Sequence, residues 1–164
     1  MGQDLVKENN VTNANSKQVG GLHYKTTSGV QHWDLCIDHG IGYLEAAATK
    51  YICRHPNKNG KQDLEKALHY AEKLLECFDQ GRIKRARGVV PLFKIVEFSR
   101  QYDLGSHEDA ACCFLFTWGA RRDIENAIGA IKRAIDKPQQ ARERIDNTGQ
   151  KHPFGFNASE EVKD

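Results

Sequence analysis

Hydrophobic residues recur with a helical period over most of the chain between its two ends. Their spacing of three and four residues predicts a long amphipathic helix over 62–79, with one apolar face. Shorter segments with the same period lie on either side, bounded by glycine, proline or turn-forming clusters. The predicted helices are 30–39, 43–55, 62–79, 92–102, 107–118 and 123–137. Since no segment alternates convincingly between apolar and polar residues, the sequence predicts an all-α fold, a small helical bundle.

The pattern also divides the chain into segments. Residues 1–19 are polar and predict a disordered N-terminal arm, and 141–164 form a polar tail. Between them, 20–81 is a first helical unit and 91–140 a second one, joined by the basic linker 82–90. We expect this linker to connect the two units and not to bind nucleic acid.

The second unit resembles a degenerate copy of the first. Gly42 and Gly105 are 63 residues apart, and at this offset Glu45 matches Glu108. After the next loop the offset falls to 60 residues, as a connection three residues shorter would require. The sequence therefore predicts two related three-helix units, although chance matches among Ala-rich helices are the alternative.

Composition and charge narrow the class of protein. The chain has 164 residues, of which 39% are hydrophobic and 28% charged, enough for one domain or two small packed units. The net charge of +2 does not resemble that of a dedicated DNA-binding protein. No apolar run is long enough to cross a bilayer, and the first residues lack the apolar region of a signal peptide. Five cysteines without a CxxC spacing indicate reduced thiols, so we expect a cytoplasmic protein without a membrane partner.

Lys50 and Arg54 lie one helical turn apart in the predicted helix 43–55. Like charges at this spacing repel each other, and the neighbouring alanines leave room for a ligand. A phosphate between them would remove the repulsion and use the planar guanidinium for bidentate contact. A solvated helix edge is the alternative. At the 63-residue offset Cys113 and Thr117 stand in place of the two cations, so the second unit would lack this function.

Three further candidates lie at the margin of the apolar stripe of helix 62–79, namely Asp63, Lys66 and Tyr70. A hairpin between the two helices could bring them beside Lys50 and Arg54. Asp63 could then orient the guanidinium, bind a ribose hydroxyl or hold a metal-bound water. A role at the helix N-terminus is the alternative for Asp63.

The segment GGLHYK holds His23 and Tyr24 outside any core pattern. Tyr24 could stack on a base with His23 near a phosphate, or both could anchor the arm. Trp33 is expected in the core. His32 and Cys36 could contribute to a zinc site, but no second pair has ligand spacing, so we predict no metal site. The sequence contains no GxxxxGK[ST], GxSxG or HExxH motif.

The stretch LHY (22–24), then GYLEAAATKYICRH and KNGKQDLEKALHYAEKLLE, resembles the phage-associated family called domain of unknown function 3310. That family includes a phage nucleotide kinase without a P-loop. The resemblance covers 22–76 and implies ligand-contacting roles for His23, Tyr24, Glu45, Lys50, Tyr51, Arg54, Asp63, Lys66 and Tyr70. Ala47 stands where members often have Asn, which implies a different substrate choice or activity if that Asn contacts base or phosphate.

Residues and resemblance together predict a phage nucleotide-binding protein that acts as a (deoxy)nucleoside monophosphate kinase. Lys50, Arg54 and Asp63 are the expected catalytic residues; Mg²⁺ could assist but is not required. We expect a homo-oligomer, since a small helical unit offers only shallow grooves. Replacing Lys50 or Arg54 by Ala should abolish binding and leave thermal stability nearly intact. The alternatives are a sponge that sequesters a nucleotide signal of the host's antiviral response without turnover, and a purely structural accessory protein.

Overall fold

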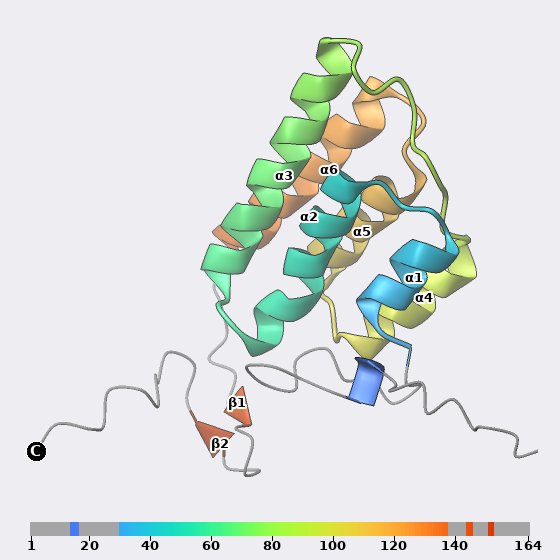
Figure 1. Ribbon diagram of the computed structural model, residues 1–164. Helices are drawn as coiled ribbons and strands as arrows, with labels where there is room; N and C mark the ends of the chain where they lie inside the picture. The colour runs from blue at the N-terminus through green and yellow to red at the C-terminus, as the bar shows by residue number, and fades with distance from the viewer. Residues whose placement is uncertain (1–13, 17–29, 138–143, 146–150, 153–164) are drawn as a thin grey trace, which may run out of the picture.

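Six α-helices form the bundle in the part of the chain that the structure describes (Figure 1). This computed structural model describes residues 14–16, 30–137, 144–145 and 151–152. The helices are α1 (His32–Asp38), α2 (Tyr43–Arg54), α3 (Lys61–Asp79), α4 (Leu92–Gln101), α5 (Ser106–Thr117) and α6 (Arg121–Asp136). Two short 3-10 helices, η1 (Ala14–Ser16) and η2 (His55–Asn57), accompany them. The predicted all-α class is confirmed, and each predicted helix has its counterpart in chain order.

Two short features among these residues depart from the predicted secondary structure, namely η1 within the predicted disordered arm and a small strand pair. β1 (Arg144–Ile145) pairs antiparallel with β2 (Lys151–His152). Strands of two residues carry too short an alternation to be recognised in a sequence. They lie within the predicted polar tail and leave the helical bundle unchanged.

The six helices pack as two hairpins, each preceded by a short helix. α2 packs on α3, and α5 packs on α6; α3 also packs on α6, and α2 on α5. α1 lies on α2 and α4 lies on α5. All six helices contribute residues to one hydrophobic cluster, so the bundle has a continuous core.

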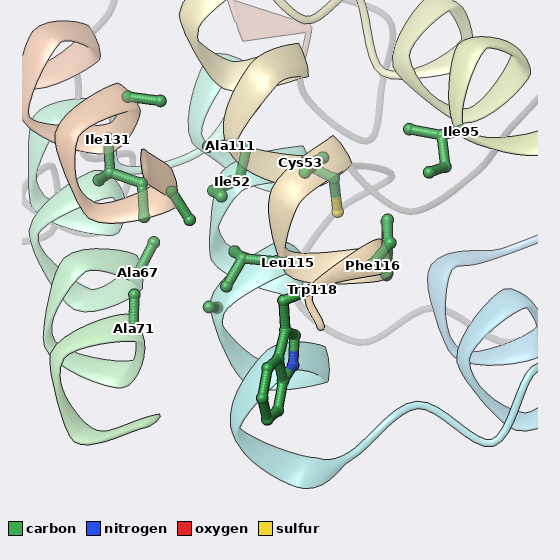
Figure 2. Packing of buried hydrophobic residues seen from close by; sticks show 14 of the residues in the cluster. Ile52, Cys53, Ala67, Ala71, Ile95, Ala111, Leu115, Phe116, Trp118 and Ile131 are labelled. Atoms are coloured by element: carbon green, nitrogen blue, oxygen red, sulfur yellow. The ribbon is translucent and has the colours of Figure 1, made fainter. Parts of the chain in front are cut away.

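Small residues let the two long helices approach closely. Ala67 and Ala71 on α3, and Ala127 and Ala130 on α6, are fully buried. Larger side chains from α5 and α6 fill the space beside them, as Figure 2 shows for Leu115. The segment 111–118, with four of its aromatic and aliphatic side chains buried, is therefore a core segment.

Two buried glutamates connect the hairpins in a reciprocal way. Glu45, in the first turn of α2, accepts a hydrogen bond of 2.9 Å from Nε1 of Trp118, just after α5. Glu108, in the first turn of α5, lies 3.4 Å from Nε2 of His55, just after α2. His55 and Trp118 are themselves 63 residues apart. The contacts thus follow the offset of the proposed repeat, whose common origin stays a prediction.

The basic linker is held against the first unit by a close backbone contact. A Cβ atom at Gly88 would overlap the carbonyl oxygen of His39, in the turn after α1. Only glycine allows this approach. The neighbouring side chains of Lys84, Arg85 and Arg87 are exposed.

Trp33 is not in the core, contrary to the prediction. Its side chain is 45% exposed, and its Nε1 donates a hydrogen bond of 2.6 Å to Asn15. α1 has only seven residues and buries Leu35 and Cys36, which leaves Trp33 on its outer side.

No helix among the described residues is both long and apolar enough to cross a membrane. All five cysteines are free thiols, and only Cys113 is partly exposed. Burial raises the pKa of Cys36 to about 12, with a further contribution from the charge of Glu45. The Cys36 thiol is therefore protonated at neutral pH and serves as a small core residue.

Candidate functional site

The α2–α3 hairpin brings the predicted cationic and acidic residues together. The chain reverses through η2 and a turn in which the carbonyl oxygen of His55 accepts a hydrogen bond of 3.1 Å from the backbone N–H of Gly60. Gly60 has a φ of +51°, a conformation that favours glycine, and α3 starts directly after it. The first turn of α3 therefore lies beside the last turn of α2.

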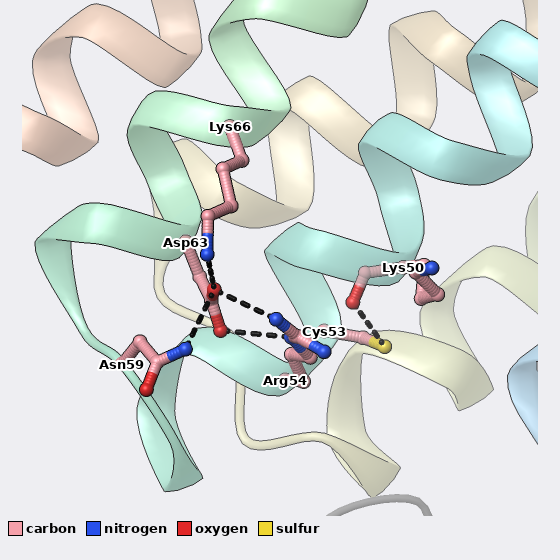
Figure 3. A network of polar contacts seen from close by, with 6 residues as sticks. All are labelled: Lys50, Cys53, Arg54, Asn59, Asp63 and Lys66. Carbon is pink, nitrogen blue, oxygen red and sulfur yellow. Dashed lines mark hydrogen bonds and ion pairs between the residues drawn. The ribbon is translucent and has the colours of Figure 1, made fainter.

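Arg54 and Asp63 form the centre of this arrangement (Figure 3). Nε and Nη2 of Arg54 donate hydrogen bonds of 2.8 and 3.0 Å to the two carboxylate oxygens of Asp63. Nδ2 of Asn59 donates another of 3.2 Å, and Nζ of Lys66 lies 3.6 Å from Oδ1. The Asp63 side chain is fully buried, whereas that of Arg54 is 14% exposed. The pair is thus a fixed, largely buried unit.

Asp63 is ionised in this setting. Burial acts to raise its pKa, but the hydrogen bonds and charge of Arg54, the Asn59 amide and the charge of Lys66 outweigh it. The pKa of Asp63 therefore lies below its ordinary value. A carboxylate held in this way positions Arg54 and is a poor proton acceptor.

Three cations surround the ring of Tyr51. Nζ of Lys50 lies 5.0 Å from the ring centroid, Cζ of Arg54 lies 4.5 Å from it, and Nζ of Lys66 lies 5.6 Å from it. In Figure 3 the Lys66 and Arg54 side chains point toward Asp63, whereas the Lys50 amine points away from it. Tyr51 thus gathers three positive charges around one aromatic ring, two of which, on Arg54 and Lys66, lie beside Asp63.

Aromatic side chains extend this surface along the hairpin. The ring of Tyr70 stacks on that of Tyr51 with centroids 5.8 Å apart, and Tyr43 meets Tyr70 edge-on at 6.2 Å. His69 also lies edge-on to Tyr70, at 6.3 Å. The hydrogen bond and the charge of Tyr43 raise the pKa of Tyr70, so its hydroxyl is protonated at neutral pH. We call these four residues the aromatic strip.

An open depression of about 430 Å³ lies at the centre of the strip. It is lined by Tyr51, Gln62, Glu65, Lys66, His69 and Tyr70. The sequence pattern indicates only that Glu65 and His69 belong to the outer face of α3, as solvated residues. Their position beside Tyr70 follows from the packing of α2 on α3, which periodicity within one helix does not reveal.

Glu45 does not join this group. Its side chain is 4% exposed, and its carboxylate is bonded to Trp118 in the interior. A buried carboxylate in that position serves packing and is not accessible to a ligand at the cationic surface. Ala47, where the family often has Asn, is also buried, with 7% exposure. His23 and Tyr24 lie outside the described residues.

The described residues contain no group of three or more His, Cys, Asp or Glu side chains arranged to hold a metal ion. Nε2 of His32 lies 2.9 Å from Oγ1 of Thr49 and 3.5 Å from Sγ of Cys36. Burial, aided by the charge of Lys50, lowers the pKa of His32 to about 3. The imidazole is therefore neutral, and its observed partners are those of a satisfied core residue.

Fold and surface together define an all-α protein with a cationic, tyrosine-rich surface on one helical hairpin. Residues 20–72 match the family model described as protein of unknown function (DUF3310), which supports membership of that family. The match includes α1, α2 and the part of α3 that carries Asp63, Lys66 and Tyr70. No curated protein and no solved structure matches the chain.

Proposed function

We propose that the surface of the α2–α3 hairpin binds the phosphate group of a nucleotide, and that the protein phosphorylates nucleoside monophosphates without a P-loop. The observation that carries this proposal is the gathering of Lys50, Arg54 and Lys66 around Tyr51. A phosphate relieves the repulsion between such cations and accepts charge-assisted hydrogen bonds from them.

The ion pair with Asp63 supports a binding role because it fixes the guanidinium of Arg54 before a ligand arrives. A preorganised side chain loses less conformational freedom on binding than a mobile one. Lys50 and Lys66 are partly exposed, and a lysine side chain is a flexible four-carbon stem. They can adjust to a phosphate, whereas Arg54 sets its position.

The aromatic strip supports a nucleotide over a simple anion. A base that stacks on Tyr70 would lie next to a phosphate held at Lys66, and stacking on an aromatic side chain contributes about 1–3 kcal/mol. The depression of about 430 Å³ falls within the range of small-ligand sites. Tyr43, with 74% of its surface exposed, adds an aromatic edge to the strip.

Transfer of a phosphoryl group demands alignment and neutralisation of charge more than covalent help from the protein. In the proposed reaction an oxygen of the monophosphate attacks the γ-phosphorus of a nucleoside triphosphate. The bond to the bridging oxygen breaks, and two diphosphates result. Lys50, Arg54 and Lys66 would stabilise the charge of the transferring group, while Asp63 keeps Arg54 in position. Mg²⁺ bound to the triphosphate would assist the same step.

A second function, a nucleotide sponge without turnover, is favoured by one feature of the site. Asp63 is fully buried and held by two hydrogen bonds from Arg54, so it neither contacts an incoming nucleotide nor accepts its proton. The same cationic surface would then retain a nucleotide signal of the host's antiviral response. The family resemblance supports a phage setting for either function, in the host cytoplasm and as a homo-oligomer.

Turnover distinguishes the two functions. The purified full chain would be incubated with each nucleoside monophosphate and a triphosphate, with and without Mg²⁺, and the nucleotides separated by chromatography. Diphosphate formation that is lost in Lys50→Ala and Lys66→Ala, but kept in Lys73→Ala, supports the kinase. Lys73 is the matched control because it lies on α3 and pairs with Glu76 outside the site. Unchanged nucleotides that remain bound to the protein support the sponge.

A further inference from the structure

Most of the large apolar side chains that are exposed among the described residues lie on or just before two helices. Seven of the eight that are prominently exposed lie on α1, on α4 or just before them, and the eighth is Tyr43. The seven are Val30, Trp33, Ile37, Val89, Leu92, Phe93 and Val96, with exposed fractions from 41% to 76%. We call this surface the α1–α4 face. Extended apolar surface of this kind is uncommon on a monomer and marks a site of interaction.

α1 and α4 lie side by side and run in opposite directions (Figure 1). The backbone N–H of His32, at the start of α1, donates a hydrogen bond of 3.1 Å to the hydroxyl of Tyr102, just after α4. At the other end, Gly88, which precedes α4, lies against His39, which follows α1. A groove of about 90 Å³ separates the helices, lined by Val30, Gln31, Leu35, Lys94, Glu97, Phe98 and Gln101.

Two of the exposed apolar residues border this groove. Val30 lines it and is 47% exposed, whereas Trp33 and Ile37 are each two residues from Leu35 and lie on the outer side of α1. Phe93 precedes Glu97 by four residues and therefore lies on the groove side of α4. The α1–α4 face thus includes a shallow groove bordered by two exposed apolar side chains, Val30 and Phe93, on which a helix can pack.

The charges at the groove indicate which helix it accepts. Lys94 and Glu97 both line it, three residues apart on α4, and carry opposite charges. Within the described part of the chain neither of them forms an ion pair; Lys94 lies over the ring of Phe93, and Glu97 accepts a hydrogen bond of 3.4 Å from Gln101. When a second copy of α4 packs antiparallel to the first, its negative charge meets Lys94 and its positive charge meets Glu97.

We propose that the α1–α4 face binds the same face of a second copy of this chain, about a two-fold axis that crosses α4 between Ile95 and Val96. Lys94 then faces Glu97 of the partner subunit, and symmetry repeats this ion pair. The same axis sets Phe93 opposite Phe98 of the partner subunit, which lies at the base of the partner's groove. This contact does not involve the α2–α3 hairpin, so it stands or fails independently of the nucleotide site.

The experiment measures the mass of the full chain by analytical ultracentrifugation over a range of concentrations. The wild type is expected to form a dimer. Phe93→Asp, Lys94→Glu and Glu97→Lys should each raise its dissociation constant by about tenfold or more, because each places a charge in apolar contact or sets like charges face to face. Arg122→Glu, on the exposed start of α6, is the matched charge reversal and should leave the constant unchanged.

Mixing the two charge-reversed variants gives the sharpest test. Lys94→Glu carries two negative groove charges and Glu97→Lys two positive ones, so an equimolar mixture should form a heterodimer more tightly than either variant forms a homodimer. The double variant Lys94→Glu, Glu97→Lys should recover the wild-type constant. A monomeric wild type, a dimer unaffected by Phe93→Asp, or a mixture that stays monomeric overturns the proposal. The first result would leave the face to a different partner, and the second would assign the dimer to another surface. Circular dichroism of each variant checks that the helices remain folded.

Discussion

Arg54 donates two hydrogen bonds to the buried carboxylate of Asp63 and thereby joins the end of α2 to the start of α3. The ion pair fixes the position of Arg54, and Arg54 is also one of the three cations around Tyr51. Fold and candidate site therefore depend on the same contact, and mutation of either partner affects both.

Replacing Arg54 by Ala should lower the free energy of unfolding by about 3–5 kcal/mol, because Asp63 remains buried without its main partner. The expectation from sequence, that this change leaves stability intact, is at odds with the observed ion pair. Lys50→Ala removes an amine that forms no ion pair among the described residues and should change stability by less than about 0.5 kcal/mol. Equilibrium unfolding in urea measures both.

A double-mutant cycle checks the origin of that loss. In the presence of Asp63→Asn, Arg54→Ala should cost much less than in the wild type, since the buried charge has been removed. Equal costs in both backgrounds would mean that the ion pair contributes nothing measurable.

Stability should fall in acid because of Asp63. Its pKa in the folded protein lies below the ordinary value of 3.8 that applies to the unfolded chain. The unfolded chain therefore binds the proton first as the pH falls, and the contribution of the pair, complete above the unfolded pKa, is lost as the pH drops through the folded one. The free energy of unfolding, measured from about pH 2 to pH 6, should rise with pH, and Asp63→Asn should flatten this rise. A wild-type slope retained in the variant would assign it to other carboxyl groups.

The chain's helices follow closely from its sequence, whereas the contacts between them do not. Apolar periodicity and the stops at Gly42, Pro56 and Gly105 suffice to predict the elements of the bundle. Trp33 was misjudged because hydrophobicity predicts burial only where a neighbouring element covers the residue, and on the outer side of α1 the contact with Asn15 leaves Trp33 45% exposed.

Asp63 illustrates the same limit for the site. Its equivalent at the 60-residue offset is Asp123, which accepts hydrogen bonds from the backbone N–H groups of Gly119 and Ala120 at the start of α6. Asp63 instead binds Arg54 across the hairpin. Both roles are open to an acidic residue in the first turn of a helix, and tertiary packing selects one.

Gly88→Ala should destabilise the protein by about 1–3 kcal/mol, because the added methyl group overlaps the backbone of His39 and forces the linker to move. Gly119→Ala is the control, since a Cβ atom there has no neighbour within 4 Å. Thermal unfolding of the two variants makes the comparison. Equal melting temperatures would show that the linker shifts without cost.

Trp118→Phe should lower the free energy of unfolding by about 1–3 kcal/mol. The reason is that Glu45 then remains buried without its hydrogen bond from Nε1 of Trp118. Phe preserves much of the aromatic packing, so the change tests the hydrogen bond between the hairpins. Adding Glu45→Leu should recover part of the loss, as an apolar residue needs no partner. Failure of the second change to recover any stability would attribute the loss to the smaller ring. Chemical denaturation provides the values.

Titration calorimetry with a panel of nucleoside monophosphates tests the central claim, that Lys50, Arg54 and Lys66 form a phosphate site, most directly. Lys50→Ala and Lys66→Ala should each weaken binding of the preferred nucleotide by about tenfold or more, because each removes one charge-assisted contact. Lys73→Ala should bind like the wild type, and all three should keep the wild-type melting temperature within a few degrees. Wild-type affinity in both Lys50→Ala and Lys66→Ala, or no binding of any nucleotide by the wild type, would contradict the account.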